Sequence, residues 1–514
     1  MARSVQLTRR PVLRSVGAAS VLLSSSLLAA CGAASAVTTS SVSTSATASV
    51  TSTGAAATPT AAPKAAGTTS QVATATSSVS TSAGTAQSVR ASSSATSTAA
   101  AVIGTGATRI EWWQGIAGPP TSPQQQADRA TLDAFIKAHP EVSVTYNTSG
   151  TGDVDEQPVL TRIAAGTPPD IVTAADLLLA SWALTKAIVP LDSYMQRDKF
   201  DTSHYWPASR TVIQYAGKTW GIPWTNDVRG LLYNKTLFRN AGLDPEKPPA
   251  TLSEANDLAD RLTKSTGDTY SQVGFIPWFG QGVWLWGWGW VYGGDFWDPN
   301  SQKVTANDPK NVAALTYFQQ EVQRLGLDKV TTFNKAQSQG KLSGPLAGHM
   351  GMWIDGNWNS ASNKKNAPDF DYGVAPWPVP DGGKASSWSG IWCDVLPQGV
   401  KNPDAAWTLL SYLGGAEAQL INCEITGDTP ARQDASEQLL PKQVAAFGPT
   451  VKDFQAIMPV SHHRPTMPAG IQYWNDMATM VQDVLNGKQQ PQPALDQLTS
   501  VTQIAVDKAL KGGG

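Results

Sequence analysis

Periodic apolar positions predict strands that alternate with helices at the start of the folded part. Residues 109–113 (RIEWW) and 142–146 (VSVTY) alternate between apolar and polar positions, which is typical of strands. Between them, residues 124–137 carry apolar side chains at helical spacing, with Leu132 and Phe135 on one face. A strand, a helix and a second strand are therefore expected to open the domain.

The same alternation continues, and it indicates a parallel sheet. Residues 159–163 are expected to be helical, and residues 169–172 are expected to begin another strand. Strands and helices in this order are typical of an α/β fold, in which ligands bind beyond the carboxyl ends of the strands. We therefore expect ligand contacts near the loops after Trp113, Tyr146 and Thr173, with Trp113 as a candidate.

The segment 278–297 (WFGQGVWLWGWGWVYGGDFW) holds six tryptophans in twenty positions, more than a hydrophobic core requires. Trp284, Trp286, Trp288 and Trp290 recur at every second position, and this periodicity alone predicts a strand. The segment is either an unusually aromatic part of the core or a surface that binds a flat, partly apolar ligand.

Residues 1–31 are predicted to be a lipoprotein signal peptide. Arg9 and Arg10 resemble a twin-arginine export signal, although general secretory export stays open, and the apolar stretch 16–30 is too short for a stable membrane span. It ends in LAAC, which is similar to a bacterial lipobox. We therefore expect a lipid such as palmitate at Cys31, which would anchor the mature protein to the outer face of the cell membrane.

Residues 32–107 consist almost entirely of Ser, Thr, Ala, Val and Gly. Such a segment cannot bury enough apolar surface to offset the entropy lost on ordering, so it is expected to be a disordered tether. As a flexible coil it would span on the order of 50 Å. The folded part would then begin near residue 108.

Size, charge and cysteine content limit the remaining possibilities. A folded part of about 400 residues is too large for one core, so we expect two lobes. Removing the signal takes away four arginines and no acid, which lowers the formal net charge from −2 to −6 and argues against nucleic-acid binding. Besides Cys31 only Cys393 and Cys423 remain, and the sequence leaves open whether they form a disulfide.

Short motifs are spread over nearly the whole folded part. They are 165–171 (AGTPPDI), 190–192 (PLD), 217–224 (GKTWGIPW), 232–238 (LYNKTLF), 348–358 (GHMGMWIDGNW), 426–432 (TGDTPAR) and 484–488 (VLNGK). Each motif alone is weak. In this order and spacing, they together resemble the extracellular solute-binding proteins of ABC importers, in the branch that includes the maltose-binding protein.

The resemblance implies a two-lobed α/β periplasmic-binding-protein fold, with hinge strands and a ligand held in the interlobe cleft. Ligand contacts from both lobes would favour the closed state. Lobe one is expected to comprise residues 108–225 and the return segment 386–435. Lobe two is expected to comprise residues 226–385 and the C-terminal helices of 436–514.

Three residues match positions that contact sugar in this family, and a fourth candidate lies beside one of them. Asp227 lies four residues after Pro223, at a hinge-side position where the maltose-binding protein has an acidic sugar contact, and Asn226 beside it adds an amide. Asp176 lies at nearly the family's spacing for another contact. Trp358 falls where the family places a sugar-stacking aromatic residue.

For the tryptophan-rich segment the resemblance implies a helix instead of a strand. On a helix, Trp284 and Trp288 would share one face, and Trp286 and Trp290 would lie roughly opposite. One pair is then expected to be buried while the other faces outward. The glycines at 287 and 289 weaken a helix but would make room for close packing.

Further candidates come from the same alignment. Trp284 falls near a ligand-stacking tyrosine of the maltose-binding protein, so Trp284 and Trp278 are expected to be ligand platforms, while most of the other tryptophans of the segment are expected to be core. Trp388 and Trp474 are also candidates for ligand contact. Arg432 could donate to a ligand or form a structural ion pair, and both possibilities stay open.

Motifs for catalysis are scarce, since no Walker loop, His-Glu-x-x-His or Gly-x-Ser-x-Gly motif is present. The histidine pair at 462–463 is expected to lie in an exposed loop and to bind no metal, and no cofactor is expected. The carboxylates of Asp176, Asp227, Asp355 and Asp428 could include a glycosidase pair or could accept hydrogen bonds from sugar hydroxyls. Binding is the less demanding role.

The expected function is capture of a sugar or oligosaccharide outside the membrane and its delivery, by a monomer without enzymatic activity, to an ABC permease. Glycerol-phosphate diesters are an alternative cargo. They would require two or more cations in the cleft, and only Arg229 and Arg432 are obvious. A surface-anchored glycoside hydrolase and an adhesive lipoprotein are further alternatives. The domain would face a periplasm or the cell surface.

Overall fold

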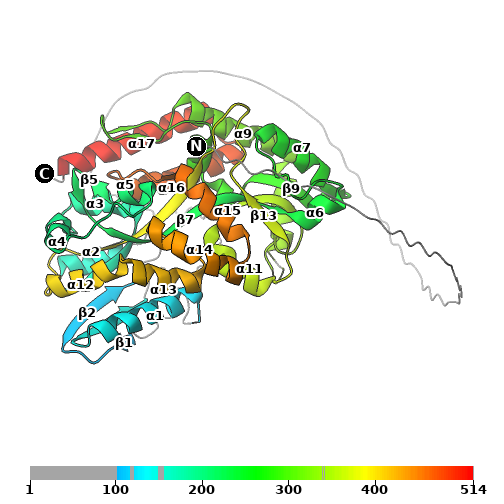
Figure 1. The fold of residues 1–514 in the computed structure, drawn as a ribbon. Coiled ribbons are helices and arrows are strands. Elements are labelled where there is room, and N and C mark those ends of the chain that lie inside the picture. The colour runs from blue at the N-terminus through cyan, green and yellow to red at the C-terminus, as the bar shows by residue number, and fades with distance from the viewer. Residues whose placement is uncertain (1–100, 116–120, 149–155, 339, 341, 513–514) are drawn as a thin grey trace, which may run out of the picture. The chain divides into compact units, whose positions relative to one another are not determined.

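The computed structural model describes residues 101–115, 121–148, 156–338, 340 and 342–512, all within one compact unit, Ala83–Gly514. Its first elements form the predicted parallel sheet, in which strand β2 pairs with β3 on one side and β4 on the other (Figure 1). The bounds are β2 Thr108–Trp113, α1 Pro123–Ala138, β3 Val142–Asn147, α2 Gln157–Ala164 and β4 Ile171–Ala175. The strands and helices predicted from periodicity are therefore confirmed here.

The expected tether extends too far toward the domain. Residues 101–107 were assigned to it, but Ala101–Ile103 form strand β1, which pairs antiparallel with β3. The reason is hydrophobic burial, because the side chain of Ile103 packs into the core beside β3. The expected signal peptide (1–31) and residues 32–100 lie outside the described residues, and so does Cys31.

One long strand, β7 (Ile222–Asn234), joins two parts of a mixed twelve-stranded sheet. Its first half pairs with β14 (Ser387–Val395), and its second half pairs with β12 (Met350–Gly356) and β13 (Tyr372–Ala375). The strand order is β1-β3-β2-β4-β14-β7-β12-β9-β8. The strands that complete it are β8 Lys264–Thr266, β9 Thr269–Gly280, β15 Thr429–Pro430 and β16 Ser461–His463.

We call the part from β1 to β14 the first half-sheet and the part from β12 to β8 the second half-sheet. The first half-sheet has a hydrophobic cluster on each face. Trp112 belongs to one cluster and Trp113 to the other, as alternation along a strand requires. The helices around it are α3 Leu179–Leu184, α4 Asp192–Asp198, α5 Pro207–Val212, α12 Pro403–Leu413 and α13 Ala416–Thr426.

The second half-sheet supports a separate, larger cluster. Helix α7 begins in a capping box, in which the Thr251 hydroxyl accepts from the Glu254 amide and the Glu254 carboxylate accepts from the Thr251 amide. The other helices of this part are α6 Lys235–Asn240, α7 Leu252–Leu262, α8 Leu285–Val291, α9 Pro309–Leu325, α10 Leu327–Gln337, α11 Ser360–Asn366, α16 Gly470–Leu485 and α17 Pro491–Gly512. In Figure 1, α6, α7 and β9 lie at the far end of the unit from β1, β2 and α1.

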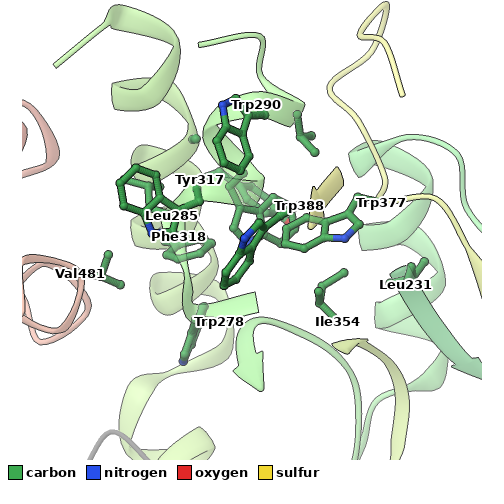
Figure 2. Packing of buried hydrophobic residues seen from close by; sticks show 14 of the residues in the cluster. Leu231, Trp278, Leu285, Trp290, Tyr317, Phe318, Ile354, Trp377, Trp388 and Val481 are labelled. Atoms are coloured by element: carbon green, nitrogen blue, oxygen red, sulfur yellow. The ribbon is translucent and has the colours of Figure 1, made fainter. Parts of the chain in front are cut away.

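The central part of the tryptophan-rich segment forms helix α8 (Leu285–Val291). The strand that its periodicity predicts is therefore wrong, and the helix that the resemblance implies is confirmed. Trp286, Trp288 and Trp290 are all buried, which overturns the expectation that one pair would face outward. The helix is enclosed on every side, and Trp288 packs against Tyr317 and Trp377. Figure 2 shows Leu285 and Trp290 of this helix with Tyr317, Phe318 and Trp377 among the buried residues of the cluster.

The glycines of α8 make room for this packing, as predicted. A Cβ at Gly287 would lie 2.4 Å from the Trp377 ring, and one at Gly289 would lie 2.3 Å from the Phe296 ring. The loss of helix propensity at these two positions is therefore offset by aromatic contacts.

Two further expectations are settled by the fold. Cys393 on β14 and Cys423 on α13 are both buried free thiols, so they form no disulfide. The histidine pair 462–463 lies in β16, which pairs parallel with β14, and not in a loop. His462 stacks on Trp290 with ring centroids 5.1 Å apart.

The remaining elements are short or peripheral. No helix in the described part of the chain combines the length and the apolar character needed to cross a bilayer. The short or peripheral elements are β5 Gln214–Tyr215, β6 Lys218–Thr219, β10 Trp297–Asp298, β11 Lys303–Val304, α14 Gln433–Phe447, α15 Thr450–Ile457 and the 3-10 turns η1 Asp176–Leu178, η2 Gln281–Val283, η3 Asn357–Asn359 and η4 Met458–Val460.

Candidate solute-binding site

Strand β7 carries an aspartate and an arginine where it passes from the first half-sheet to the second. Asp227 and Arg229 lie two positions apart and therefore on the same face of the strand, where Arg229 Nη1 donates to Asp227 Oδ1. The Gly390 amide of β14 also donates to Asp227 Oδ1, at 2.5 Å. A Cβ at Gly390 would lie 2.7 Å from this oxygen, so the glycine leaves space for the carboxylate.

Arg229 lies between two tryptophans. Its guanidinium carbon is 3.8 Å from the ring centroid of Trp388 and 4.6 Å from that of Trp358 in η3, both within cation–π range. The backbone is fixed as well, because the carbonyl of Arg229 accepts from Ser387 Oγ and Trp377 Nε1. Only 6% of Arg229 is exposed.

A second arginine–aspartate pair lies beside the first. Arg464, which follows β16, has its Nη2 2.5 Å from Oδ1 of Asp176, the first residue of η1. Desolvation raises the pKa of the buried Asp176 carboxyl, and the charge of Arg464 lowers it. The Arg464 guanidinium lies 4.9 Å from the Trp474 ring and 5.9 Å from the Trp388 ring.

Three tryptophans from distant parts of the sequence complete the cluster. Trp284, just before α8, stacks on Trp474 of α16 with ring centroids 3.5 Å apart and planes inclined by 26°. Trp388 of β14 meets Trp284 edge to face at 6.4 Å and lies 5.9 Å from Trp474. Tryptophans and arginines alternate from Trp358 to Trp474, and Trp284 stacks on the last of them. We call this group the tryptophan–arginine cluster: Trp358, Arg229, Trp388, Arg464, Trp474 and Trp284.

Asp355, at the end of β12, lies near this cluster. Its Oδ1 accepts from the Gly356 amide at 2.8 Å and from Asn359 Nδ2 at 3.0 Å. Burial raises the pKa of Asp355 to about 6, while the two hydrogen bonds and the charge of Arg229 lower it. This carboxyl therefore titrates above the ordinary range of aspartate.

Several buried polar atoms of the site have no hydrogen-bond partner among the described residues. The donors are Nε of Arg229, Nε of Arg464 and Nε1 of Trp388. The acceptor is Oδ2 of Asp176, whose Oδ1 contacts Arg464 as an ion pair without hydrogen-bond alignment. Buried polar groups are rarely left unpaired, and such groups beside indole faces are typical of a small-molecule site.

The structure therefore brings together Asp176, Asp227, Trp284, Trp358, Trp388 and Trp474, with Asp355 nearby. Asn226 points to the opposite face of β7, because neighbouring residues of a strand alternate. There its Nδ2 donates to Ser209 Oγ at 2.9 Å. It is adjacent to Asp227 in sequence but does not share its surroundings.

Three other candidates, Trp113, Trp278 and Arg432, contact residues outside the tryptophan–arginine cluster. Trp113 donates to Glu111 Oε1 at 2.6 Å and is covered by Arg162, whose guanidinium lies 5.0 Å from the ring. Trp278 is a core residue packed against Phe318, so its expected role as a ligand platform is wrong. It lies on a strand whose other buried residues face the same cluster.

Arg432 forms the structural ion pair that the sequence left open. Its guanidinium donates to both carboxylate oxygens of Asp434, and its amide donates to Gln419. It lines a surface hollow with Tyr412 and His204. An ion pair at the start of α14 therefore accounts for this arginine.

Sequence reasoning missed Arg464 as a site residue. Arg464 follows two histidines and precedes a proline, a context without periodicity or a recognisable motif. The signal that could have found Arg464 is its position in a segment that returns to the sheet. A lone cation there is costly to bury, so it needs an acidic partner. No group of three or more His, Cys, Asp and Glu is arranged to hold a metal within the ranges the structure covers.

Several known proteins are similar to this chain. An ABC transporter extracellular-binding protein of Pyrococcus horikoshii is 25% identical over 338 residues, covering 63% of this chain and 71% of its own. A maltooligosaccharide ABC transporter solute-binding lipoprotein of Streptococcus pneumoniae is 24% identical over 288 residues, covering 54% and 63%. The solved structure of CpMnBP1 with mannotriose bound is 26% identical with a TM-score of 0.66, covering 76% of this chain and 99% of that one.

The likeness in structure confirms the two-lobed α/β fold of periplasmic binding proteins. The sequence model of one family, the bacterial extracellular solute-binding proteins, matches residues 118–420, which is more than half of the chain. Members of this family bind their solutes outside the cytoplasm, as the name states. The chain therefore belongs to the bacterial extracellular solute-binding proteins, in the branch that serves ABC transporters.

Proposed function

We propose that this protein captures a neutral sugar or oligosaccharide outside the cytoplasm and delivers it to an ABC permease. The observation that carries the proposal is the mixture of unpartnered donors and acceptors beside the indole faces of the tryptophan–arginine cluster. Hydroxyl groups both donate and accept hydrogen bonds, whereas a phosphate mainly accepts and an ammonium only donates. The apolar C–H face of a pyranose fits an indole ring.

The relatives support the same class of solute. CpMnBP1 carries mannotriose in its structure, and the S. pneumoniae relative is described as binding maltooligosaccharides. At about a quarter identity these names support a saccharide in general but do not select one sugar.

The charge balance of the site disfavours a phosphate diester. Arg229 and Arg464 provide two cations, but each already contacts a carboxylate, Asp227 and Asp176 respectively. Asp355 adds a further acid nearby. A phosphate would therefore have to displace an aspartate from its arginine, which leaves a buried charge unpaired.

The carboxylates also fit binding better than catalysis. A glycosidase needs a protonated carboxyl as its acid and a second carboxylate as base or nucleophile. Asp176 and Asp227 are each paired with an arginine, so neither carboxyl group is free to act on a sugar. Asp355 has the raised pKa of an acid, but the Gly356 amide and Asn359 direct hydrogen bonds to it.

The membrane attachment and the lobe boundaries belong to the same proposal. We propose that Cys31 carries the lipid and that residues beyond it form a tether to a monomeric domain, which is supported by the LAAC motif and the lipoprotein relative. Lobe one would comprise the chain from β1 (Ala101–Ile103) to 225 and 386–435, and lobe two 226–385 and 436–514. The boundary at 225 falls within β7, the strand shared by both half-sheets.

The test is calorimetric titration of the full chain, with Cys31→Ser to keep it soluble, against mannose and glucose oligosaccharides of one to five units and glycerophosphodiesters. We expect saturable one-to-one binding of a saccharide, with unchanged sugar recovered by chromatography afterwards. Binding of the diester alone would favour the phosphate cargo. Cleaved sugar would make the protein an enzyme and overturn the proposal.

A further inference from the structure

Arg229 occupies a slot between two flat aromatic surfaces. Its guanidinium carbon lies 3.8 Å from the ring centroid of Trp388 and 4.6 Å from that of Trp358. These separations are close to the van der Waals contact at which any flat group stacks on an indole. The guanidinium thus occupies the space between the two indole rings in which a pyranose ring could otherwise stack.

Several contacts hold Arg229 in this slot. Its Nη1 donates to Asp227, its carbonyl accepts from Ser387 and Trp377, and the strand is paired on both sides. Displacing the guanidinium would leave the carboxylate of Asp227 without its cation. A bound sugar therefore leaves it in place, because an unpaired buried charge costs more than one stacked ring gains.

The other side of Trp358 offers little room. A Cβ at Gly356 would lie 1.7 Å from the Trp358 ring, so this ring already lies against the backbone. Trp388, by contrast, also meets Trp284 and Trp474. Trp388 is fully buried, whereas Trp284 and Trp474 are only partly buried, so the indole faces that a solute can reach on this side are those of Trp284 and Trp474.

Resting on the function proposed above, we propose that Arg229 determines specificity by limiting the length of the saccharide. Its guanidinium fills the subsite between Trp358 and Trp388 and confines the solute to the region of Trp284 and Trp474. The favoured solute is then a short saccharide. Emptying the slot would add one subsite.

The experiment compares the wild-type chain with Arg229→Lys and Arg229→Ser, all carrying Cys31→Ser. Lysine keeps a cation for Asp227 but lacks the flat guanidinium, and serine empties the slot. Arg432→Lys is the matched control, because Arg432 also pairs with an aspartate and lies over an aromatic ring, Tyr205. Each protein is titrated calorimetrically with mannose and glucose oligosaccharides of one to five units.

We expect the wild-type affinity to stop rising at a short length and the optimum of both Arg229 variants to move one unit longer. The gain for that longer sugar should be about tenfold over wild type, whereas Arg432→Lys should keep the wild-type profile. The same optimum in wild type and variants, even with weaker binding, would overturn the proposal. So would loss of folding in both variants by circular dichroism, which would make Arg229 purely structural.

Failure of the underlying function is distinguishable. If the wild-type chain binds no saccharide of the series, the proposed function is wrong and this inference is wrong with it. If wild type binds and only the length profile is unaltered, the function stands and the role of Arg229 does not.

Discussion

The tryptophans of α8 and Trp284, which lies just before them in the sequence, have very different surroundings. Trp286, Trp288 and Trp290 of α8 are enclosed by aromatic and aliphatic side chains, and Trp288 Nε1 donates to the Gly282 carbonyl at 2.8 Å. Trp284, two residues earlier, instead stacks on Trp474 among buried arginines and aspartates. The neighbours of an indole, and not its frequency, distinguish core from binding site.

The same comparison explains why charged side chains lie in the tryptophan–arginine cluster and not around the tryptophans of α8. An indole packed against Phe and Tyr needs a partner only for its N–H. Three indoles of the tryptophan–arginine cluster, those of Trp358, Trp388 and Trp474, face a guanidinium, and each guanidinium is balanced by an aspartate. Such a network has a cost in desolvation that a core would avoid, which is reason to assign it a function.

The largest expected effect is on stability, from truncating the core group. Trp288→Ala should lower the free energy of unfolding by about 3–5 kcal/mol, because it removes a fully buried ring and leaves a cavity. The saccharide affinity of the folded protein should change less than threefold. Urea unfolding followed by fluorescence and calorimetric titration measure the two quantities. A large loss of affinity with unchanged stability would erase the distinction between the groups.

The next largest effect is on affinity, from the charged network. Asp227→Asn should weaken saccharide binding roughly 100-fold, since hydrogen bonds to a charged acceptor contribute about 1.5–3 kcal/mol each and Arg229 loses its anion. Asp434→Asn removes the partner of Arg432 outside the site and is the control, with an expected change below twofold. Equal losses in the two variants would show that Asp227 acts through general stability alone.

How much of this the sequence could predict depends on the kind of signal. Periodicity is local, so α1, β2 and β3 were predictable, and the resemblance placed Asp227, Trp358 and Trp474 near the site. Trp278 and Trp284 look alike in sequence, however, and only packing against Phe318 or against Trp474 separates them.

The part that could not be predicted involves contacts between distant residues. Arg464 meets Asp176 across 288 positions of sequence, and nothing in either segment identifies the other. Ile103 shows the same limit on a smaller scale, since three residues of a low-complexity segment become a strand only because β3 offers an edge. Propensity cannot anticipate an available partner.

A smaller effect separates Trp284 and Trp474 from the core. Trp474→Ala should reduce saccharide affinity about tenfold, because one stacking face is lost, and should lower the free energy of unfolding by less than about 2 kcal/mol, because the side chain is only partly buried. The stacked Trp284–Trp474 pair should also give an exciton signal in far-ultraviolet circular dichroism that the variant lacks. Persistence of that signal would mean that another indole pair produces it.

The smallest effect is a pH dependence that the site has and the α8 core lacks. Burial raises the pKa of Asp355 to about 6, above the value near 4 of an unfolded aspartate. The folded protein therefore binds the extra proton between these values, so its contribution to stability is fully present below pH 4 and is lost as the pH rises through 6. We expect the free energy of unfolding to fall by about 1–2 kcal/mol over this window. Asp355→Asn should remove that component, whereas Trp288→Phe should keep it. An unchanged slope in Asp355→Asn would assign the titration to other buried carboxyls, such as Asp128 or Asp394, whose pKa burial raises to about 7.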